Sequence, residues 1–335
     1  MFFNKNQNQM ILIGVLANRN WVLGNLVKEI HRRLPKSTRL WWVLSVFAQK
    51  NRIEPFLDFG LPKRKVYFFS YLSIFERYFM KKPQQFFENS IILYTHHESE
   101  LGSLKRQASM LNASYATYFM CSSDARLLVS NGLNISKVRL CYFGIDTECT
   151  PENLVSRDEK IIVLASKFGP RKGLEKLPHI IDKLPDWNFV ALGRGWEEFI
   201  REHSLVEKQN FEYHKFNKEN RQNYFTKARI FLSLSSKEGG PVPLIEAMYL
   251  GVTPVATSVG FAPDLIKNNV NGILLDAEPS TEDVIAAITK AESLNSNPSK
   301  SVEFLTWDRF ARMVEIDRKA ILTKEKENTQ TRRSD

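Results

Sequence analysis

Short apolar runs alternate with amphipathic segments along most of the chain. Runs rich in β-branched and aromatic residues predict buried strands, and apolar residues spaced three or four apart predict helices. The expected strands cover residues 10–16, 40–47, 66–69, 90–94, 119–123, 138–143, 160–166, 187–195, 211–216, 230–234, 253–257 and 273–275. The expected helices cover residues 22–34, 73–79, 124–131, 222–228, 244–250, 281–291 and 301–323. This alternation predicts an α/β protein with parallel sheets.

The length of the chain favours two domains. Its 335 residues are many for one core and suit two domains of about 150 residues each. The polar stretch 150–159 is the natural linker, so we expect a first domain over 1–155 and a second over 156–305. A helix over 306–324 and a polar, disordered tail over 325–335 should follow.

Composition indicates a reduced, globular protein. The chain is 43% hydrophobic and 25% charged, which is ordinary for a soluble domain. Cys121, Cys141 and Cys149 form no Cys-x-x-Cys pair, so we expect buried thiols, a cytoplasmic location and no zinc site. The apolar run 10–17 follows only one basic residue, Lys5, and has no convincing cleavage site. We interpret it as the first strand rather than a signal peptide.

Positive charge is concentrated in the first half of the chain. Residues 1–155 hold 20 Lys and Arg against 11 Asp and Glu, whereas residues 156–335 hold 27 against 26. A basic surface could bind nucleic acid, an anionic membrane or an acidic substrate. Neither a zinc-finger spacing nor an RNP-type aromatic motif is present, so we do not expect nucleic acid as a partner.

Segment 62–83 places basic residues on both sides of an aromatic centre. This pattern suits the interface of an anionic membrane, and it fits a core strand and helix with solvated ends equally well. We therefore expect a cytoplasmic protein that can lie peripherally on the inner face of the membrane, with the second interpretation left open. The aromatic residues are Tyr67, Phe68, Phe69, Tyr71, Phe75, Tyr78 and Phe79.

The most informative chemistry lies in segment 235–251, which reads SSKEGGPVPLIEAMYLG. Gly239 and Gly240 precede a predicted helix, and Gly251 is a suitable residue to end it. Glycines before a helix N-terminus let backbone N–H groups approach an anion, and the helix dipole also favours negative charge there. The segment therefore predicts a phosphate site.

Two carboxylates accompany this predicted phosphate site. Glu238 stands in the loop and Glu246 on the helix. A carboxylate accepts hydrogen bonds from vicinal hydroxyls, as on a ribose or a hexose, and repels phosphate. The glutamates are therefore candidates for binding sugar hydroxyls. A helix cap with one solvated glutamate is the alternative interpretation.

Segment 235–251 resembles the signature of retaining glycosyltransferases of the GT-B fold, the family 4 type, or glycosyl transferases group 1. Residues 167–173, KFGPRKG, are similar to the family's G-R-x-x-x-x-K-G, with Lys167 where arginine is usual. Residues 95–98, THHE, are similar to its T-x-H-D/E setting, and 260–264, GFAPD, to its G-G-x-P-E turn. The resemblance is tight over 160–276, looser over 90–151 and poor over 17–85.

The resemblance implies two doubly wound Rossmann-like domains that face a cleft, and a nucleotide-diphosphate sugar as donor. The first domain would bind the acceptor, the second would bind the nucleotide sugar, and the helix over 306–324 would cross back to the first domain. Lys172 would stabilise the departing diphosphate, Glu238 would hold the donor sugar, and His97 would contact that sugar from the opposite domain. The other donor-binding residues that it implies are Lys167, Arg171, Gly239, Gly240 and Glu246, with Phe216 at the nucleobase. Solvated loop lysines and helix-capping loop histidines are the alternatives.

Two further residues are candidates with weaker support. His96 is the neighbour of the implied active-site histidine. The family usually has a glycine-rich loop after the first strand, but this chain reads ANRNWVLGN over residues 17–25, with Gly24 as its one glycine. Either Arg19 and the asparagines replace the usual backbone contacts, or the loop contributes little to substrate binding.

The implied activity is transfer of a hexose-type sugar to a glycan or lipid-linked acceptor, in cell-surface polysaccharide or lipopolysaccharide synthesis. The chain has no Asp-x-Asp motif, and its lysines can replace a divalent cation, so we expect neither metal nor cofactor. Two alternatives stay open. The altered first loop would suit a non-catalytic nucleotide- or carbohydrate-binding protein, and the same fold could support a nucleotide-sugar epimerase.

Overall fold

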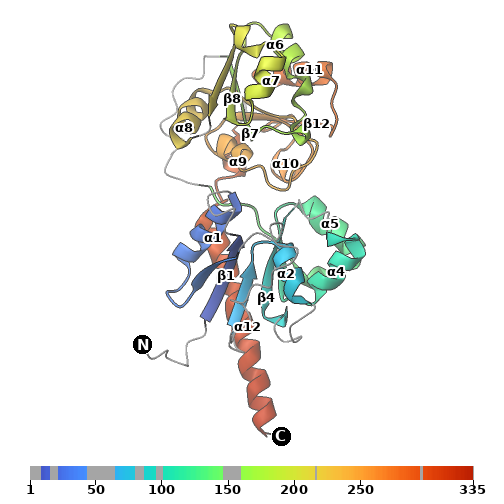
Figure 1. Cartoon of the computed structure of the whole chain (residues 1–335), viewed down its shortest axis with the longest axis vertical. Helices are drawn as coiled ribbons and strands as arrows, with labels where there is room; N and C mark the ends of the chain where they lie inside the picture. The colour runs from blue at the N-terminus through green and yellow to red at the C-terminus, as the bar shows by residue number, and fades with distance from the viewer. Residues whose placement is uncertain are drawn as a thin grey trace. The chain divides into compact units, whose positions relative to one another are not determined.

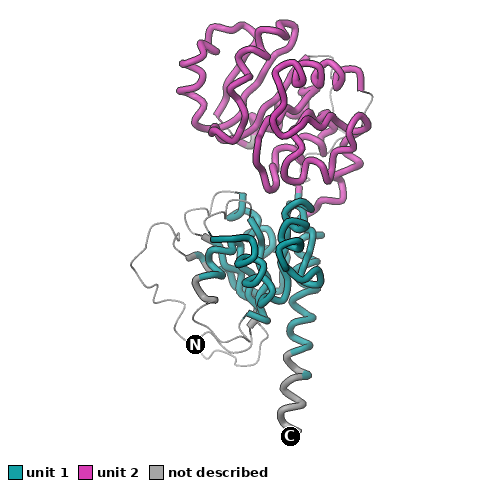
Figure 2. Tube along the Cα trace, turned by 90° about the vertical axis from the view of Figure 1, so that its right-hand side faces the viewer, with its two compact units in different colours: residues 1–144, 307–335 teal, residues 145–306 magenta. Residues whose placement is uncertain are grey.

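A computed structural model describes residues 9–15, 22–43, 65–79, 87–95, 101–145, 160–215, 217–294 and 297–334. The chain forms two compact units, which Figure 2 colours separately: residues 1–144 with 307–335 (unit 1), and residues 145–306 (unit 2). Each unit contains one six-stranded sheet of parallel strands covered by helices (Figure 1). This confirms the predicted pair of doubly wound α/β domains.

The sheet of unit 1 has the strand order β2-β1-β3-β4-β5-β6. Its strands are β1 (Gln9–Val15), β2 (Arg39–Val43), β3 (Lys65–Phe69), β4 (Ser90–Tyr94), β5 (Ala116–Phe119) and β6 (Val138–Leu140). Its helices are α1 (Val22–Arg33), α2 (Leu72–Phe79), α4 (Leu104–Asn112), α5 (Ser122–Ser130) and α12 (Trp307–Ser334).

Both faces of this sheet are buried. Successive side chains along a strand point to opposite faces, and helices cover each face. Phe69 belongs to a core cluster that includes residues of α2, α4 and α5. On the opposite face, the Phe68 and Tyr118 rings meet edge to face with centroids 6.1 Å apart. The Tyr118 ring also lies 6.0 Å from that of Phe310 on α12. Burial on both faces explains why these strands appear in the sequence as continuous apolar runs.

A buried carboxylate joins α12 to the sheet. The Tyr118 hydroxyl donates to Asp317 Oδ2 at 2.8 Å, and Arg139 Nη2 donates to Asp317 Oδ1 at 3.3 Å. Burial, and then the neighbouring Asp317 charge, raises the pKa of Tyr118 well above its usual value, so the phenol remains a donor. Removing either partner would leave a buried carboxylate incompletely paired, which is costly.

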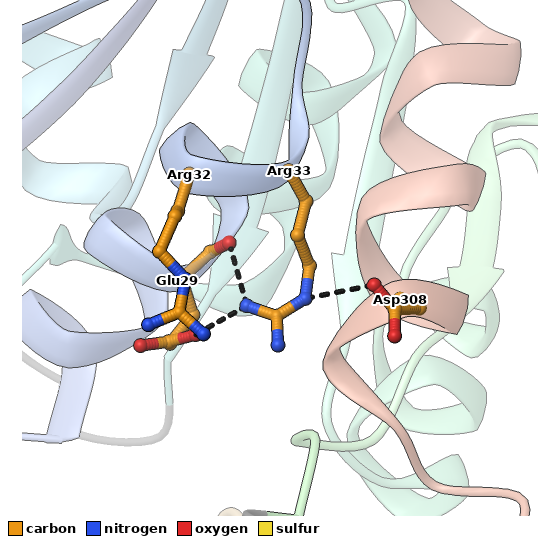
Figure 3. Close-up of polar contacts among 4 residues, drawn as sticks. All are labelled: Glu29, Arg32, Arg33 and Asp308. Atoms are coloured by element: carbon orange, nitrogen blue, oxygen red, sulfur yellow. Dashed lines mark hydrogen bonds and ion pairs between the residues drawn. The ribbon is translucent and has the colours of Figure 1, made fainter.

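A second contact joins α12 to α1 near the surface. Arg33 Nε donates to Asp308 Oδ1 at 2.9 Å, and Arg33 Nη1 donates to the Glu29 carbonyl at 3.2 Å and also binds the Glu29 carboxylate (Figure 3). The Asp308 side chain is 75% exposed. Because exposed ion pairs contribute roughly 0–1 kcal/mol, the buried Asp317 contact is the stronger attachment of α12.

The sheet of unit 2 has the strand order β12-β11-β10-β7-β8-β9. Its strands are β7 (Ile161–Lys167), β8 (Asn188–Arg194), β9 (Phe211–Lys215), β10 (Ile230–Ser233), β11 (Thr253–Thr257) and β12 (Ile273–Leu275). Its helices are α6 (Leu177–Lys183), α7 (Glu197–Glu202), α8 (Lys218–Lys227), α9 (Val242–Tyr249), α10 (Ala262–Leu265) and α11 (Thr281–Glu292).

Helices of unit 2 also cover both faces of its sheet. Buried residues of α6, α7 and α11 share one core with alternate residues of the central strands, such as Ile230 and Leu232. Between these two positions, Phe231 turns to the other face and packs edge to face on Phe225 of α8, with centroids 5.8 Å apart. The sheet is therefore enclosed, and its strand ends are the natural place for polar chemistry.

Unit 2 begins and ends at neighbouring positions. The Ile145 N–H donates to the Leu305 carbonyl at 2.7 Å, and Ile145 pairs with Thr306 in a parallel bridge. Unit 2 is thus one continuous segment, and α12 belongs to unit 1. The linker expected over 150–159 lies outside the described residues.

The segments that differ from the sequence predictions include the end of β5 and the C-terminal tail. The strand expected over 119–123 is wrong: β5 ends at Phe119, and α5 begins at Ser122. The β-forming residues are Ala116–Phe119, whereas the following Ser-Ser-Asp suits a helix start. The tail expected to be disordered from 325 is helical to Ser334, in a sequence rich in the helix formers Lys, Glu, Gln and Arg.

The aromatic segment belongs to the core where the structure describes it. Tyr67, Phe68, Phe69 and Phe75 are all at most 2% exposed, so these rings cannot rest in a membrane interface. The interpretation as a core strand and helix is the correct one for them. In the described part of the chain, the helices are all too short or too polar to cross a bilayer.

The described cysteines fit the expectation of buried thiols. Cys121 and Cys141 are both free and buried. Burial raises the pKa of each thiol to about 12, so neither is a thiolate at neutral pH.

Candidate functional site

The structure brings together Lys172 and Glu238, two residues predicted to be catalytic. β7 and β10 are parallel neighbours, so both chains leave the sheet at the same edge. Lys172 lies in the turn after β7 and Glu238 in the loop after β10. Lys172 Nζ forms an ion pair with Glu238 Oε1, and the two side chains are 21% and 12% exposed. The lysine and the glutamate thus form an ion pair in which both side chains are mostly buried.

Backbone contacts fix the approach of these two loops. Gly173 has a φ of +61°, and a Cβ atom there would lie 2.2 Å from the Leu234 carbonyl oxygen. The Ser236 N–H also donates to the Arg171 carbonyl at 2.9 Å. Only glycine permits this approach, so Gly173 fixes the backbone next to Lys172 and thereby positions the lysine.

The loop after β11 supports Glu238 from another side. Gly260 has a φ of +57°, and a Cβ atom there would lie 2.8 Å from the carbonyl oxygens of both Glu238 and Gly239. The Thr257 hydroxyl donates to the Ser235 carbonyl at 2.5 Å. The ends of β7, β10 and β11 therefore converge on the backbone that carries Glu238.

The helix predicted after the two glycines is present as α9. Pro241 occupies its N-cap position, and Gly239 and Gly240 directly precede it. Proline has no side-chain oxygen to cap the first turn, so an external anion suits this end. At the other end, Gly251 has a φ of +78° and its N–H donates to the Met248 carbonyl at 2.8 Å. This confirms the predicted cap, a Schellman motif.

Glu246 on α9 is held by a residue that sequence analysis missed. Arg221 Nη1 donates to Glu246 Oε1 at 2.5 Å, and the side chains are 19% and 13% exposed. We expected the helix before β10 to begin at residue 222, but α8 begins at Lys218. Asn217 caps it by accepting from the Asn220 N–H at 2.6 Å. That N-cap residue was the available signal for placing Arg221 within the helix.

A polar cluster joins the same helix to the edge strand β9. The Tyr224 hydroxyl donates to Glu212 Oε2 at 2.9 Å, and His214 Nε2 lies 3.1 Å from the same oxygen. The hydrogen bond with His214, more than any other contact, lowers the pKa of Glu212. Burial and then Glu212 raise the pKa of Tyr224 to about 12. Helix α8 is therefore held by polar contacts at both Arg221 and Tyr224.

Arg171 lies in the same turn as Lys172, Lys167 precedes this turn, and both Arg171 and Lys167 are exposed. Lys167 is the last residue of β7, where it pairs in register with Arg194 of β8. Trp196 Nε1 donates to the preceding Ser166 carbonyl at 2.9 Å. The buried tryptophan therefore fixes the end of the strand, and the roles of Lys167 and Arg171 stay predictions.

Four predicted site residues lie outside the described part of the chain. They are Arg19, His96, His97 and Phe216. Thr95, which ends the segment described after β4, is buried. The predictions for these residues therefore stay predictions.

A family model and solved structures show what the chain is similar to. Residues 147–303, which hold the whole of this site, match the family described as Glycosyl transferases group 1. The chain resembles sucrose-phosphate synthase from Thermosynechococcus elongatus with a TM-score of 0.70, at 15% identity over 95% of this chain and 100% of that one. It resembles Anabaena HepE in complex with UDP-glucose with a TM-score of 0.62, at 13% identity over 96% and 99%. The two units thus have the GT-B glycosyltransferase fold.

A curated relative extends the comparison to sequence. The chain is 25% identical over 219 residues to a subunit of phosphatidylinositol N-acetylglucosaminyltransferase from Homo sapiens. The match covers 62% of this chain and 44% of the human protein, so this chain spans less than half the length of that relative.

The two glycines of the loop after β7 offer a matched test of the backbone approach. Gly173→Ala should lower the free energy of unfolding of unit 2 by about 2–5 kcal/mol, the sum of left-handed strain and overpacking. Gly169 is extended at a φ of 171°, and a Cβ atom there would meet no described atom within 4 Å. Gly169→Ala should therefore change stability little. Urea unfolding checks this, and equal losses in both variants would contradict the assigned role of Gly173.

Proposed function

We propose that this chain is a retaining glycosyltransferase. It moves a hexose-type sugar from a nucleotide-diphosphate sugar to a hydroxyl of a glycan or lipid-linked acceptor, in the assembly of a cell-surface polysaccharide or lipopolysaccharide. The observation that carries the proposal is the Lys172–Glu238 pair at the ends of β7 and β10, within the segment that matches the family model. The UDP-glucose complex of HepE supports a nucleotide-sugar donor, and the name of the human relative supports a lipid acceptor.

The chemistry needs a cation where charge develops. As the bond from the anomeric carbon to the diphosphate breaks, negative charge grows on the departing phosphate oxygen. The Lys172 ammonium, with Lys167 and the Gly239 and Gly240 amides, stabilises that charge. The acceptor oxygen bonds to the anomeric carbon and passes its proton to the departing phosphate. Glu238 holds the sugar, and its carboxylate stabilises positive charge at the anomeric carbon.

The ion pair between Lys172 and Glu238 gives donor binding a clear first step. In the structure each group satisfies the other's charge, as a mostly buried position requires. A diphosphate carries more negative charge than one carboxylate and competes for Lys172. Glu238 is then released to accept hydrogen bonds from the sugar. Binding of the diphosphate thus places Lys172 on the leaving group and frees Glu238 for the sugar.

A panel of nucleotide sugars tests the function. Purified protein is incubated with UDP-, GDP- and ADP-linked sugars, with and without lipid extract, in buffer that contains EDTA. We expect release of nucleoside diphosphate that increases with the acceptor, unchanged by EDTA, and a product whose anomeric configuration matches that of the donor. An altered sugar on an intact diphosphate would instead indicate an epimerase. Absence of turnover would indicate a binding protein, and inverted product would contradict retention.

Association with an anionic membrane surface is a further part of the proposal. It depends on the excess of Lys and Arg in residues 1–155, because Tyr67, Phe68, Phe69 and Phe75 of the 62–83 segment are buried. We expect the protein to sediment with anionic vesicles at low salt and to be released at high salt, where screening is stronger. Binding that ignores salt and lipid charge would contradict this.

Lys172→Ala should reduce turnover at least about tenfold at saturating donor, because the ammonium meets charge that grows during departure of the diphosphate. Lys167→Arg is the matched variant: it keeps the charge and restores the residue usual in the family, so activity should be kept. Steady-state kinetics check both. Unchanged turnover in Lys172→Ala would remove that residue from the mechanism, and an inactive Lys167→Arg would mean that Lys167 is misplaced.

The two glutamates should separate binding from turnover. Glu246→Gln should weaken binding of free nucleoside diphosphate, because the charge that holds the ribose hydroxyls is lost. Glu238→Gln should leave that affinity nearly unchanged and depress turnover instead. Calorimetry with nucleoside diphosphate, followed by kinetics, gives the pattern. The reverse pattern would exchange the two roles, and two silent variants would reduce the pair to structural residues.

A further inference from the structure

Arg221 has no role in the proposed function so far, yet it contacts one of the two key carboxylates. It lies in the first turns of α8, and Glu246 lies on α9. Its guanidinium donates to Glu246 Oε1 at 2.5 Å, with both side chains mostly buried. The contact therefore joins the helix before β10 to the helix after it.

We infer that Arg221 is a positioning residue for the donor nucleotide: its guanidinium holds the Glu246 carboxylate oriented toward the ribose hydroxyls. This inference rests on the proposed function. A carboxylate that is 13% exposed is costly to keep ionised without a partner, and only the ionised form accepts from two vicinal hydroxyls at full strength. A planar guanidinium also restricts the direction of the carboxylate more than an ammonium does.

The position of Arg221 favours this role over direct phosphate binding. The cations that the sequence assigns to the diphosphate lie elsewhere: Lys167 ends β7, and Lys172 lies in the turn that follows it. Arg221 lies instead on α8, one helical turn from Tyr224, whose hydroxyl is bonded to Glu212. The contact of Tyr224 with Glu212 holds α8 against β9. Arg221 therefore contacts Glu246 from a helix whose position is fixed. Such support of a binding residue by an outer contact is what holds it in a productive orientation.

The inference makes a prediction about the sugar of the nucleotide. UDP, GDP and ADP are first titrated by calorimetry, and the one that binds is compared with its 2′-deoxy and 3′-deoxy forms. Wild-type protein should prefer the ribonucleotide at least about tenfold, because a charged acceptor loses a hydroxyl partner in the deoxy forms. Arg221→Met should reduce that ratio to about threefold or less while leaving deoxynucleotide affinity nearly unchanged.

Three further variants separate positioning from a purely structural contact. Arg221→Lys, which keeps charge and loses the fork, should give an intermediate ratio and serves if the Met variant does not fold. In a Glu246→Gln background, Arg221→Met should add no further loss of the ratio. Lys227 is exposed on the same helix and forms no ion pair among the described residues, so Lys227→Met should behave as wild type.

Two outcomes would overturn the inference and not the proposed function. An unchanged ribose ratio in folded Arg221→Met, or in Arg221→Lys where that is the folded variant, would show that the contact only joins two helices. An equal loss for ribonucleotide and deoxynucleotide would assign Arg221 to the diphosphate. In both cases transfer by wild-type protein would leave the proposed function standing. Wild-type protein that binds none of the three diphosphates and transfers no sugar would overturn the proposed function, and this inference with it.

Discussion

The turn after β7 packs against the end of β10 at Gly173, where a Cβ atom would lie 2.2 Å from the Leu234 carbonyl oxygen, so the packing depends on glycine having no side chain. The hydrogen bond from Ser236 to Arg171 continues the same contact, and Gly260 closes on the backbone of Glu238 from β11. The ion pair of Lys172 with Glu238 depends on all of these contacts.

Pairing of opposite charges is the second principle of the site. Glu238 is held by Lys172 and Glu246 by Arg221, so the structure shows neither carboxylate isolated. Half-buried charges require such partners. The two pairs still differ in what a ligand would do to them. In the proposed function, a diphosphate would compete with Glu238 for its lysine, whereas ribose hydroxyls would bind Glu246 without displacing its arginine.

The sequence predicts what is local and leaves out what is distant. Strands such as Ser90–Tyr94 and Thr253–Thr257 were placed correctly because strands buried on both faces are short apolar runs between turn residues. Glu238 and Glu246 could be identified from the sequence because both lie in the continuous segment 235–251, which resembles a family signature. Arg221 did not, because its partner lies 25 residues away and no periodic pattern records an ion pair between two helices. Segment 62–83 was ambiguous, since aromatic residues suit a core and a membrane interface alike.

Helix α12 completes unit 1 although all of unit 2 precedes it in the chain. During synthesis, the sheet residues of unit 1 that rest on α12, such as Tyr118, are made long before Phe310 and Asp317 can cover them. At roughly 5–20 residues per second, making residues 145–306 takes on the order of ten seconds. Unit 2, an uninterrupted segment, can fold within that interval. Unit 2 can therefore complete its fold before α12 is available to complete unit 1.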